Sequence, residues 1–255
     1  MLKTVNLDIG FDKPLVRDIN IYIEKPSLVQ VMGPNGAGKT TFLKTLAGLI
    51  KPLNGRIYIN GVDVTGSSER AGRFISFSPQ IVASKQGETF PISVWEFVEF
   101  GADLCHKKRG AGISKIELRK VVKDALDSVG ISQELWGKSI WRLSGGQRQR
   151  VFIARTIACD TPIILLDEPL SSIDPEGKAE IANLIGSISK SKIVIATCHD
   201  PEMLLRYTDL ILLIGKGRYV VGKPENVLTG DVLREFYGES IVEFANHIHV
   251  CDYHA

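Results

Sequence analysis

The sequence predicts an α/β fold, and three observations support this prediction. Short apolar runs of strand length alternate with longer segments of helical spacing, which is typical of a sheet covered by helices. One apolar run leads into a glycine-rich turn that opens a helix-like segment, and another leads into the turn pair Asn60-Gly61. With 255 residues, 44% of them hydrophobic, the chain can bury a sizeable core as one large domain or as a domain with a subdomain.

The N-terminal part contains most of the strand-like runs. Alternating or continuous apolar residues predict strands over 2–9, 19–23, 27–32, 56–59 and 74–78. A helix is predicted over 41–49, because Gly48 and the following Pro52 are typical of a helix end.

The sequence changes in character from about residue 86 to residue 144. Residues 92–100 and 115–129 have helical spacing and many charges, and a loop rich in Lys and Gly separates them at 106–112. We interpret this stretch as a helical subdomain inserted into a core made of residues 1–85 and 145–230. The second half of the core is predicted to alternate helices with strands, and residues 231–255 form a C-terminal appendage. The expected elements are a helix from 145, strands at 163–166, 193–197 and 210–214, and helices over 175–189 and 201–207.

The glycine-rich turn reads Gly33-Pro34-Asn35-Gly36-Ala37-Gly38-Lys39-Thr40, which fits G-x-x-x-x-G-K-[ST] between a strand and a helix. Glycines let backbone amide groups wrap a phosphate, and the helix N-terminus adds partial positive charge. We expect Lys39 to reach the β- and γ-phosphates, Thr40 to ligate Mg²⁺ and Thr41 to support the α-phosphate. The turn therefore predicts binding of a nucleoside triphosphate.

Two further segments carry polar groups suited to the same ligand. Asp167 and Glu168 end the apolar run 163–166, where a carboxylate can hold Mg²⁺ through water; a solvated acidic pair is the alternative. Leu143-Ser144-Gly145-Gly146-Gln147 begins a predicted helix, so its hydroxyl and glycine amides are placed to meet a phosphate. A glycine-rich helix start without a ligand is the alternative for this segment.

Together and in this order, the three segments resemble those of the nucleotide-binding subunit of an ABC transporter, over about residues 2–230. The resemblance implies a RecA-like P-loop NTPase core with an antiparallel β subdomain and the inserted helical subdomain. It implies an ATPase in which Asp167 serves Mg²⁺ and Glu168 is the general base. It also implies a head-to-tail dimer, in which Ser144, Gly145, Gly146 and Gln147 of one subunit close over ATP held by the other.

Four more residues match positions of that family. Gln80 matches the glutamine that touches Mg²⁺ and water, and His199 matches the histidine that contacts the γ-phosphate. Asp174 matches the loop that signals between subunits, and Phe11 matches the aromatic residue that stacks on adenine. The alternatives are satisfied polar residues for the first three and a plain apolar turn residue for Phe11.

The segment after Gln80 favours one branch of the family. Residues 90–101 resemble the FPxxVxxxVxxG stretch of importers for metals, iron chelates and cobalamin. In that family, a coupling helix of the integral membrane permease subunits docks near this stretch, and an extracytoplasmic substrate-binding protein completes the system. Trp95, Phe97 and Phe100 are candidate apolar anchors for the helix, with packing inside the subdomain as the alternative.

The C-terminal end contains His247, His249, Cys251 and His254. The first three would share one face of an extended strand, and imidazole and thiolate suit Zn²⁺. One hypothesis is a metal-sensing site, which favours Zn²⁺, Mn²⁺ or Fe as the cargo; an ordinary strand or a flexible end is the alternative.

Composition restricts the partners and the location. A net charge of +2 is too small to argue for nucleic acid, and no apolar run reaches the roughly 18 residues needed to span a bilayer. We therefore expect a peripheral protein at the cytoplasmic face of the cell membrane, without a signal peptide. The four cysteines lack CxxC spacing and are expected to be reduced thiols.

Two other functions remain open. One is a soluble ABC ATPase without a transport role, such as an iron–sulfur assembly component. The other is a translation or DNA-repair clamp, but such a clamp usually needs two cassettes or a long coiled-coil insert, and neither is visible here.

Overall fold

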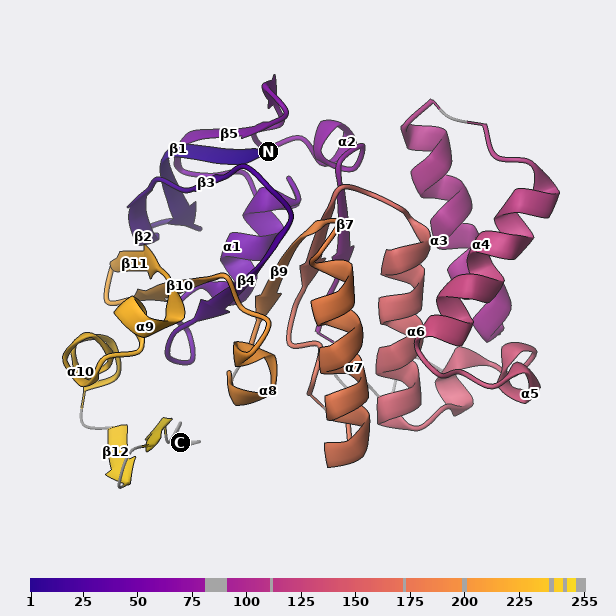
Figure 1. Ribbon diagram of the computed structural model, residues 1–255. Helices are drawn as coiled ribbons and strands as arrows, with labels where there is room; N and C mark the ends of the chain where they lie inside the picture. Colours follow the sequence, from indigo (N-terminus) through magenta and orange to yellow (C-terminus); the bar gives the residue numbers. More distant parts are fainter. Residues whose placement is uncertain are drawn as a thin grey trace.

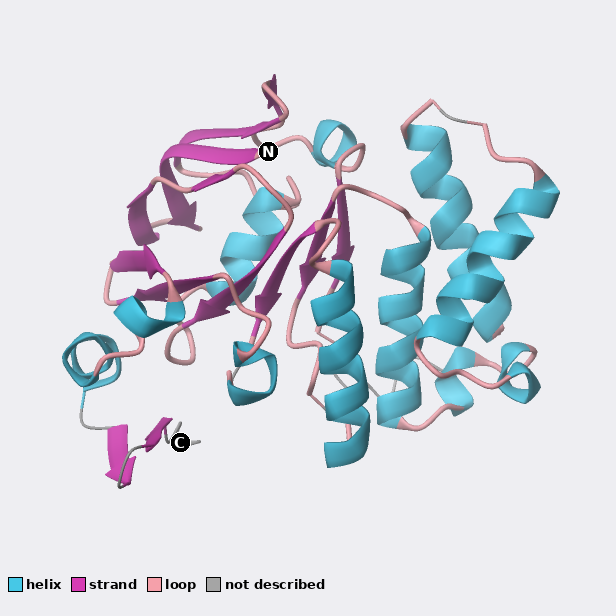
Figure 2. Ribbon diagram, in the orientation of Figure 1, coloured by secondary structure: helices cyan, strands magenta, loops and turns pink. Residues whose placement is uncertain are grey.

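The computed structural model describes residues 1–80, 91–110, 112–171, 173–198, 201–238, 241–244 and 247–250. Figure 1 and Figure 2 show a small antiparallel sheet at one side, a central, mostly parallel sheet, and a group of long helices at the other side. This arrangement confirms the predicted α/β class with an antiparallel β subdomain and a helical insertion.

The antiparallel sheet has the strand order β2-β1-β5-β6, and β3 also pairs with β1. The prediction of one strand over 19–23 was wrong, because the chain turns there. Asp18 has a φ of 54°, and the Asn20 side-chain amide donates to the Asp18 carbonyl at 2.7 Å. The strands are β1 Leu2–Gly10, β2 Pro14–Ile19, β3 Tyr22–Ile23, β5 Asn54–Ile59 and β6 Val62–Asp63.

The central sheet has the strand order β11-β10-β4-β9-β8-β7. All neighbours run parallel except β11, which pairs antiparallel with β10 at one edge. The carboxyl ends of the parallel strands therefore meet at one edge of the sheet, where such folds bind their ligands. The strands are β4 Ser27–Met32, β7 Ile75–Ser78, β8 Ile163–Leu166, β9 Ile193–Thr197, β10 Leu210–Gly215 and β11 Arg218–Gly222.

The two faces of the central sheet are covered by different helices. Ile163 and Leu165 of β8 join the buried cluster of helix α1 (Lys39–Leu46). Their neighbours Ile164 and Leu166 join the cluster of α6 (Gly145–Ala158) and α7 (Pro175–Ile188). Because side chains alternate across a strand, α1 and α6 lie on opposite faces of the sheet.

The helical layer consists of α3, α4, α5 and the short η2, packed against α6. Helices α3 and α4 begin at capping boxes, Ser93 with Glu96 and Ser114 with Glu117. Helix α3 extends into the predicted loop at 106–112, supported by the 2.6 Å ion pair of Lys107 with Asp103 one turn earlier. The bounds are α3 Val94–Lys108, α4 Lys115–Ser128, α5 Gln133–Trp136 and η2 Ile140–Arg142.

The expectation of reduced cysteines was wrong for one pair. Cys105 near the end of α3 and Cys159 just after α6 form a disulfide, with their Cα atoms 5.3 Å apart. The two residues are 54 positions apart, so no local spacing could reveal the pair. Cys198 is buried, as expected, and Cys251 lies outside the described residues.

The C-terminal part packs on β10 of the central sheet. Leu233 and Phe236 of α10 are buried against Ile211 and Leu213 of β10. Within the described ranges, no helix is both long and apolar enough to cross a membrane. The remaining elements are α2 Ser68–Ala71, α8 Glu202–Leu205, α9 Pro224–Val227, α10 Gly230–Tyr237, and the hairpin of β12 Ile241–Phe244 with β13 His247–Val250.

Candidate functional site

The glycine-rich turn connects the carboxyl end of β4 to the first residue of α1. Gly33 has a φ of 147°, and a Cβ there would lie 2.0 Å from the Ile214 carbonyl oxygen, so only glycine fits beside β10. Lys39 is buried, and its ammonium group donates to the carbonyls of Gly33 at 2.6 Å and Pro34 at 3.1 Å. The amine is therefore held inside the curve of the loop, where a phosphate would be wrapped.

An acidic residue from β8 meets this loop. The Thr40 hydroxyl donates to Oδ1 of Asp167 at 3.1 Å, and the Thr197 hydroxyl donates to the same oxygen at 2.8 Å. Asp167 and Thr197 are buried, at 2% and 0% exposure. A hydroxyl and a carboxylate within one hydrogen bond of each other are oxygen ligands of the kind that Mg²⁺ prefers, so these residues fit that ion.

Glu168 follows in a constrained conformation. Its φ of 50° lies in the left-handed region, which costs a residue with a Cβ about 1–2 kcal/mol. Its backbone amide donates to the Thr197 hydroxyl at 2.8 Å, and its Oε2 accepts from Nε2 of Gln80 at 2.5 Å. The strained backbone thus directs the Glu168 carboxylate toward Gln80, which follows the end of β7. The hydroxyl of Thr197, at the end of the neighbouring strand β9, fixes the turn.

A groove of about 310 Å³ lies along the loop. Glu168 lines one part of it, and Phe11 with Leu15 lines another. Phe11 is 64% exposed, so its ring is available to a ligand rather than packed in the core. The groove also contains most of the predicted phosphate-binding residues, namely Asn35, Gly36, Ala37, Gly38, Lys39, Thr40 and Thr41.

The second glycine motif forms a separate helix start. Ser144 caps α6: its hydroxyl accepts from the Gln147 amide at 3.3 Å, and Oε1 of Gln147 accepts from the Ser144 amide at 3.2 Å. The guanidinium of Arg148 donates to the carbonyls of Trp141 and Leu143, both at 3.3 Å, and lies over the Trp141 ring. Ser144 is not among the residues that line the groove of its own chain.

Asp174 does not line the groove. Asp174 is exposed and caps α7 by accepting from the Gly177 amide at 3.4 Å. His199 lies outside the described residues, as do Cys251 and His254 of the C-terminal metal hypothesis. His247 and His249 belong to β13, and no group of three or more metal-binding side chains forms among the described residues.

Comparisons with known proteins identify the family. The sequence pattern of the ABC transporter family matches residues 16–171. The chain belongs to the ABC transporter family. It is 34% identical, over 91% of its length and 80% of the relative, to the energy-coupling factor transporter ATP-binding protein EcfA2 of Caldanaerobacter subterraneus subsp. tengcongensis. It is 32% identical, over 92% of its length and 87% of the relative, to the iron(3+)-hydroxamate import ATP-binding protein FhuC of Bacillus subtilis.

Solved structures agree with this assignment. A dimeric ATP-binding cassette in a post-hydrolysis state, bound to ADP and Pi, superposes with a TM-score of 0.74 at 26% identity. The superposition covers 88% of this chain and 98% of that one. The chain is therefore an ABC ATPase, which binds and hydrolyses ATP.

Sequence reasoning missed one residue of this ABC ATPase site. Thr197 contacts both carboxylate residues, yet it appeared only as the last residue of a predicted strand. A polar residue ending an otherwise apolar strand, two positions before His199, was the available signal.

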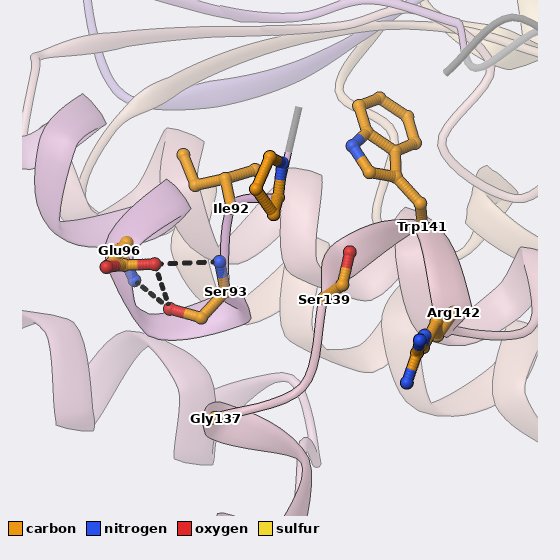
Figure 3. Close-up of a pocket in the computed structure, with 8 residues that line it drawn as sticks. Ile92, Ser93, Glu96, Gly137, Ser139, Trp141 and Arg142 are labelled. Carbon is orange, nitrogen blue, oxygen red and sulfur yellow. Dashed lines mark hydrogen bonds between the residues drawn. The ribbon is translucent and has the colours of Figure 1, made fainter. Parts of the chain in front are cut away.

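The importer-like segment of the ABC ATPase borders a second hollow, of about 570 Å³. In Figure 3, Ile92, Ser93 and Glu96 at the start of α3 lie on one side of it, and Trp141 and Arg142 lie on the other. The hydrogen bonds of Ser93 with Glu96 hold the α3 side in place.

Of the three candidate anchors, two pack inside the helical layer and one is exposed to solvent. The ring centroids of Trp95 and Trp136 lie 5.2 Å apart, and those of Phe97 and Phe152 lie 4.8 Å apart, with both pairs of rings tilted, so Trp95 and Phe97 pack within the helical layer. Phe100 is 63% exposed and is the one of the three that presents its ring to solvent.

Proposed function

We propose that this ABC ATPase pairs head-to-tail with a second copy of itself and powers import of a metal ion or metal chelate through a separate membrane permease. One observation carries the dimer: Ser144 at the start of α6 and Lys39 at the start of α1 are held on opposite faces of one sheet. Ser144 does not line the groove that contains Lys39, which supports the proposal that the helix-terminal amides of α6 meet phosphates held by a second copy.

Within this proposal, the groove residues take the following roles. Phe11 stacks on adenine, residues 33–38 wrap the phosphates, Lys39 holds the β- and γ-phosphates and Thr41 supports the α-phosphate. Mg²⁺, when bound, neutralises charge developing between the phosphates; Thr40, Asp167 and Gln80 hold it. Ser144, Gly145, Gly146 and Gln147 of the second copy cover the γ-phosphate, with Asp174 at the junction.

Glu168 is the proposed general base. Its carboxylate takes a proton from water as the water oxygen attacks the γ-phosphorus, and the bond from that phosphorus to the bridging oxygen breaks in line. The 2.5 Å hydrogen bond from Gln80 and the constrained backbone fix the direction of the carboxylate before water arrives. His199 is assigned to the γ-phosphate by the family resemblance.

The importer role is supported by relatives and by one surface. FhuC of B. subtilis is named for iron-hydroxamate import. The proposed docking site of a permease helix is the hollow between Glu96 and Trp141. The exposed Phe100 lies on the same helix as Glu96. A peripheral position at the cytoplasmic face and an extracytoplasmic substrate-binding protein belong to the same proposal. Co-purification with a permease separates it from a soluble ABC ATPase.

The division of the chain is also proposed: a core of residues 1–85 and 145–230, a helical subdomain of about 86–144, and an appendage of 231–255. The contacts of α6 with both α3 and β7 make this helix the bridge between the two parts.

A mixing experiment tests the composite site. Both test variants carry Glu168→Gln, which is expected to trap ATP. In one, Lys39→Ala disables the phosphate-loop half of the pocket; in the other, Ser144→Arg disables the half formed by the start of α6. Neither variant alone should occlude nucleotide. Mixed in equal amounts, they should form heterodimers with one intact pocket that traps one ATP. A mixture that traps none, while Glu168→Gln alone dimerises and traps two, would show that both halves act within one chain.

A further inference from the structure

Strand β4 carries a polar side chain in the interior of the central sheet. Gln30 is 0% exposed, and its partners across the sheet are Ala196 of β9 and Ile211 of β10, which are also 0% exposed. Residues paired across neighbouring strands lie on the same face of a sheet, so the Gln30 side chain has apolar neighbours on both sides. An apolar side chain of the same length would suit this position.

The Gln30 amide is only half satisfied. Its Nε2 donates to the carbonyl oxygen of Pro201 at 3.1 Å, which fixes the orientation of the amide because a carbonyl oxygen can only accept. Its Oε1 is buried and has no hydrogen-bond partner among the described residues. A buried acceptor without a donor destabilises the folded chain, so the stability of the sheet does not explain a glutamine here.

The carbonyl that Gln30 contacts belongs to the turn after β9. In Figure 1, α8 lies beyond the carboxyl end of β9, and Pro201 is the cap before this helix. Leu204 of α8 is buried in the same apolar cluster as Ala196, and Leu205 packs against the cluster that contains Ile211. The hydrogen bond thus joins β4 to the start of a helix that is 171 positions away in the sequence.

This turn contains a residue of the proposed site. His199, which is assigned to the γ-phosphate, lies in the sequence between Thr197 and Pro201. The Thr197 end of the turn is fixed by its hydrogen bonds with the two acidic residues of the site. The Pro201 end is fixed by Gln30. The segment that carries His199 is therefore held at both ends.

The strand of Gln30 also leads to the phosphates. β4 ends at Met32, and the next residue, Gly33, begins the phosphate loop. Gln30 does not line the groove, so it can affect the site only through the elements that it joins. Its hydrogen bond sets the position of the turn relative to the loop that wraps the phosphates.

We propose that Gln30 is a positioning residue for ATP hydrolysis. Its hydrogen bond to Pro201 holds the turn at the distance from the phosphate loop at which His199 meets the γ-phosphate. The inference rests on the proposed role of His199 and adds the residue that supports it. The amide supplies a donor to the catalytic turn, and the unpaired Oε1 is the loss of stability that accompanies this donor.

Gln30→Met tests the donor, because methionine keeps an unbranched side chain of similar size. The Pro201 carbonyl retains a second donor, the Leu204 amide at 3.2 Å, so the substitution removes one buried unpaired atom and creates none. The urea midpoint should therefore be unchanged or higher, while kcat falls about tenfold and KM for ATP changes by less than about twofold. Ile211→Leu, a volume-conserving change at the neighbouring buried position, is the matched control and should retain kcat.

Hydrogen exchange of the full chain without nucleotide, followed by mass spectrometry, reports on the turn directly. In Gln30→Met, the amides of residues 198–204 should exchange about tenfold faster than in the native chain, because the turn has lost one of its two anchors. Peptides from the rest of the central sheet should exchange at the native rate. Ile211→Leu should match the native chain throughout.

A double-mutant cycle with His199→Ala shows whether Gln30 acts through the histidine. His199→Ala should lower kcat, and adding Gln30→Met should lower it no further. Native kcat in Gln30→Met, a urea midpoint that falls together with kcat, unchanged exchange at 198–204, or a full additional loss in the double variant would each overturn the inference. Native kcat in His199→Ala would remove the proposed role of the histidine as well, whereas a normal Gln30→Met beside an impaired His199→Ala contradicts this inference alone.

Discussion

Thr197 holds the two acidic residues of the site together, and its replacement by valine should separate their positioning from general stability. Valine keeps the β-branched shape and removes only the hydroxyl. That hydroxyl donates to the Asp167 carboxylate at 2.8 Å and accepts from the Glu168 amide at 2.8 Å, at a position with 0% exposure. A hydrogen bond to a charged group contributes about 1.5–3 kcal/mol, and leaving a buried amide unsatisfied costs about 1–3 kcal/mol.

Thr197→Val should therefore lower the free energy of unfolding by about 3–5 kcal/mol. Part of that loss should appear in catalysis, because the backbone turn that directs Glu168 loses its partner. If about 1.4–2.7 kcal/mol of this lost stabilisation raises the activation free energy of hydrolysis, kcat falls ten- to a hundredfold. Steady-state ATPase assays and urea unfolding monitored by circular dichroism measure the two effects on the same preparation.

Thr161→Val is the matched control. Thr161 is equally buried, and its hydroxyl forms hydrogen bonds with Ser76 Oγ at 2.8 Å and with the Ile163 carbonyl oxygen at 2.9 Å, at the opposite end of β8. It should lose stability and keep its kcat. If Thr197→Val loses stability but retains kcat within about twofold, the hydroxyl supports the fold alone and the positioning argument fails.

Two further predictions concern the helical layer. Reducing the Cys105–Cys159 disulfide, which closes a loop of 54 residues, should lower the free energy of unfolding by about 4 kcal/mol. Urea titrations with and without dithiothreitol measure this difference. Equal urea midpoints under the two conditions, or reaction of both cysteines as free thiols in the untreated chain, would contradict the bond. Hydrogen bonds from the Ser93 side chain and backbone lower the pKa of Glu96 below 4.5. The contribution of the ionised Glu96 cap to the free energy of unfolding is therefore complete above pH 4.5, and it is lost as pH falls through the lowered pKa. The difference in urea midpoint between the native chain and Glu96→Gln should shrink toward zero below pH 4.5, and a difference that grows on acidification would reverse the sign of the argument.

Local patterns in the sequence determined the parts of this protein whose structure depends on near neighbours. The spacing of residues 33–40 predicted a phosphate loop, and the structure places it between β4 and α1. The apolar runs at 163–166 and 193–197 became buried strands with the predicted bounds. In each case, a few consecutive residues carry both the backbone preference and the burial that decide the element.

The tertiary structure alone decided what joins distant parts of the chain. The hydrogen bond from Thr197 to Asp167 spans 30 positions, the disulfide spans 54, and the hydrogen bond from Gln30 to Pro201 spans 171. The placement of α1 and α6 on opposite faces of the sheet is likewise a tertiary feature, seen in which residues of β8 pack with each helix. No periodicity records such contacts, because they arise only when strands far apart in sequence become neighbours and bring their side chains together.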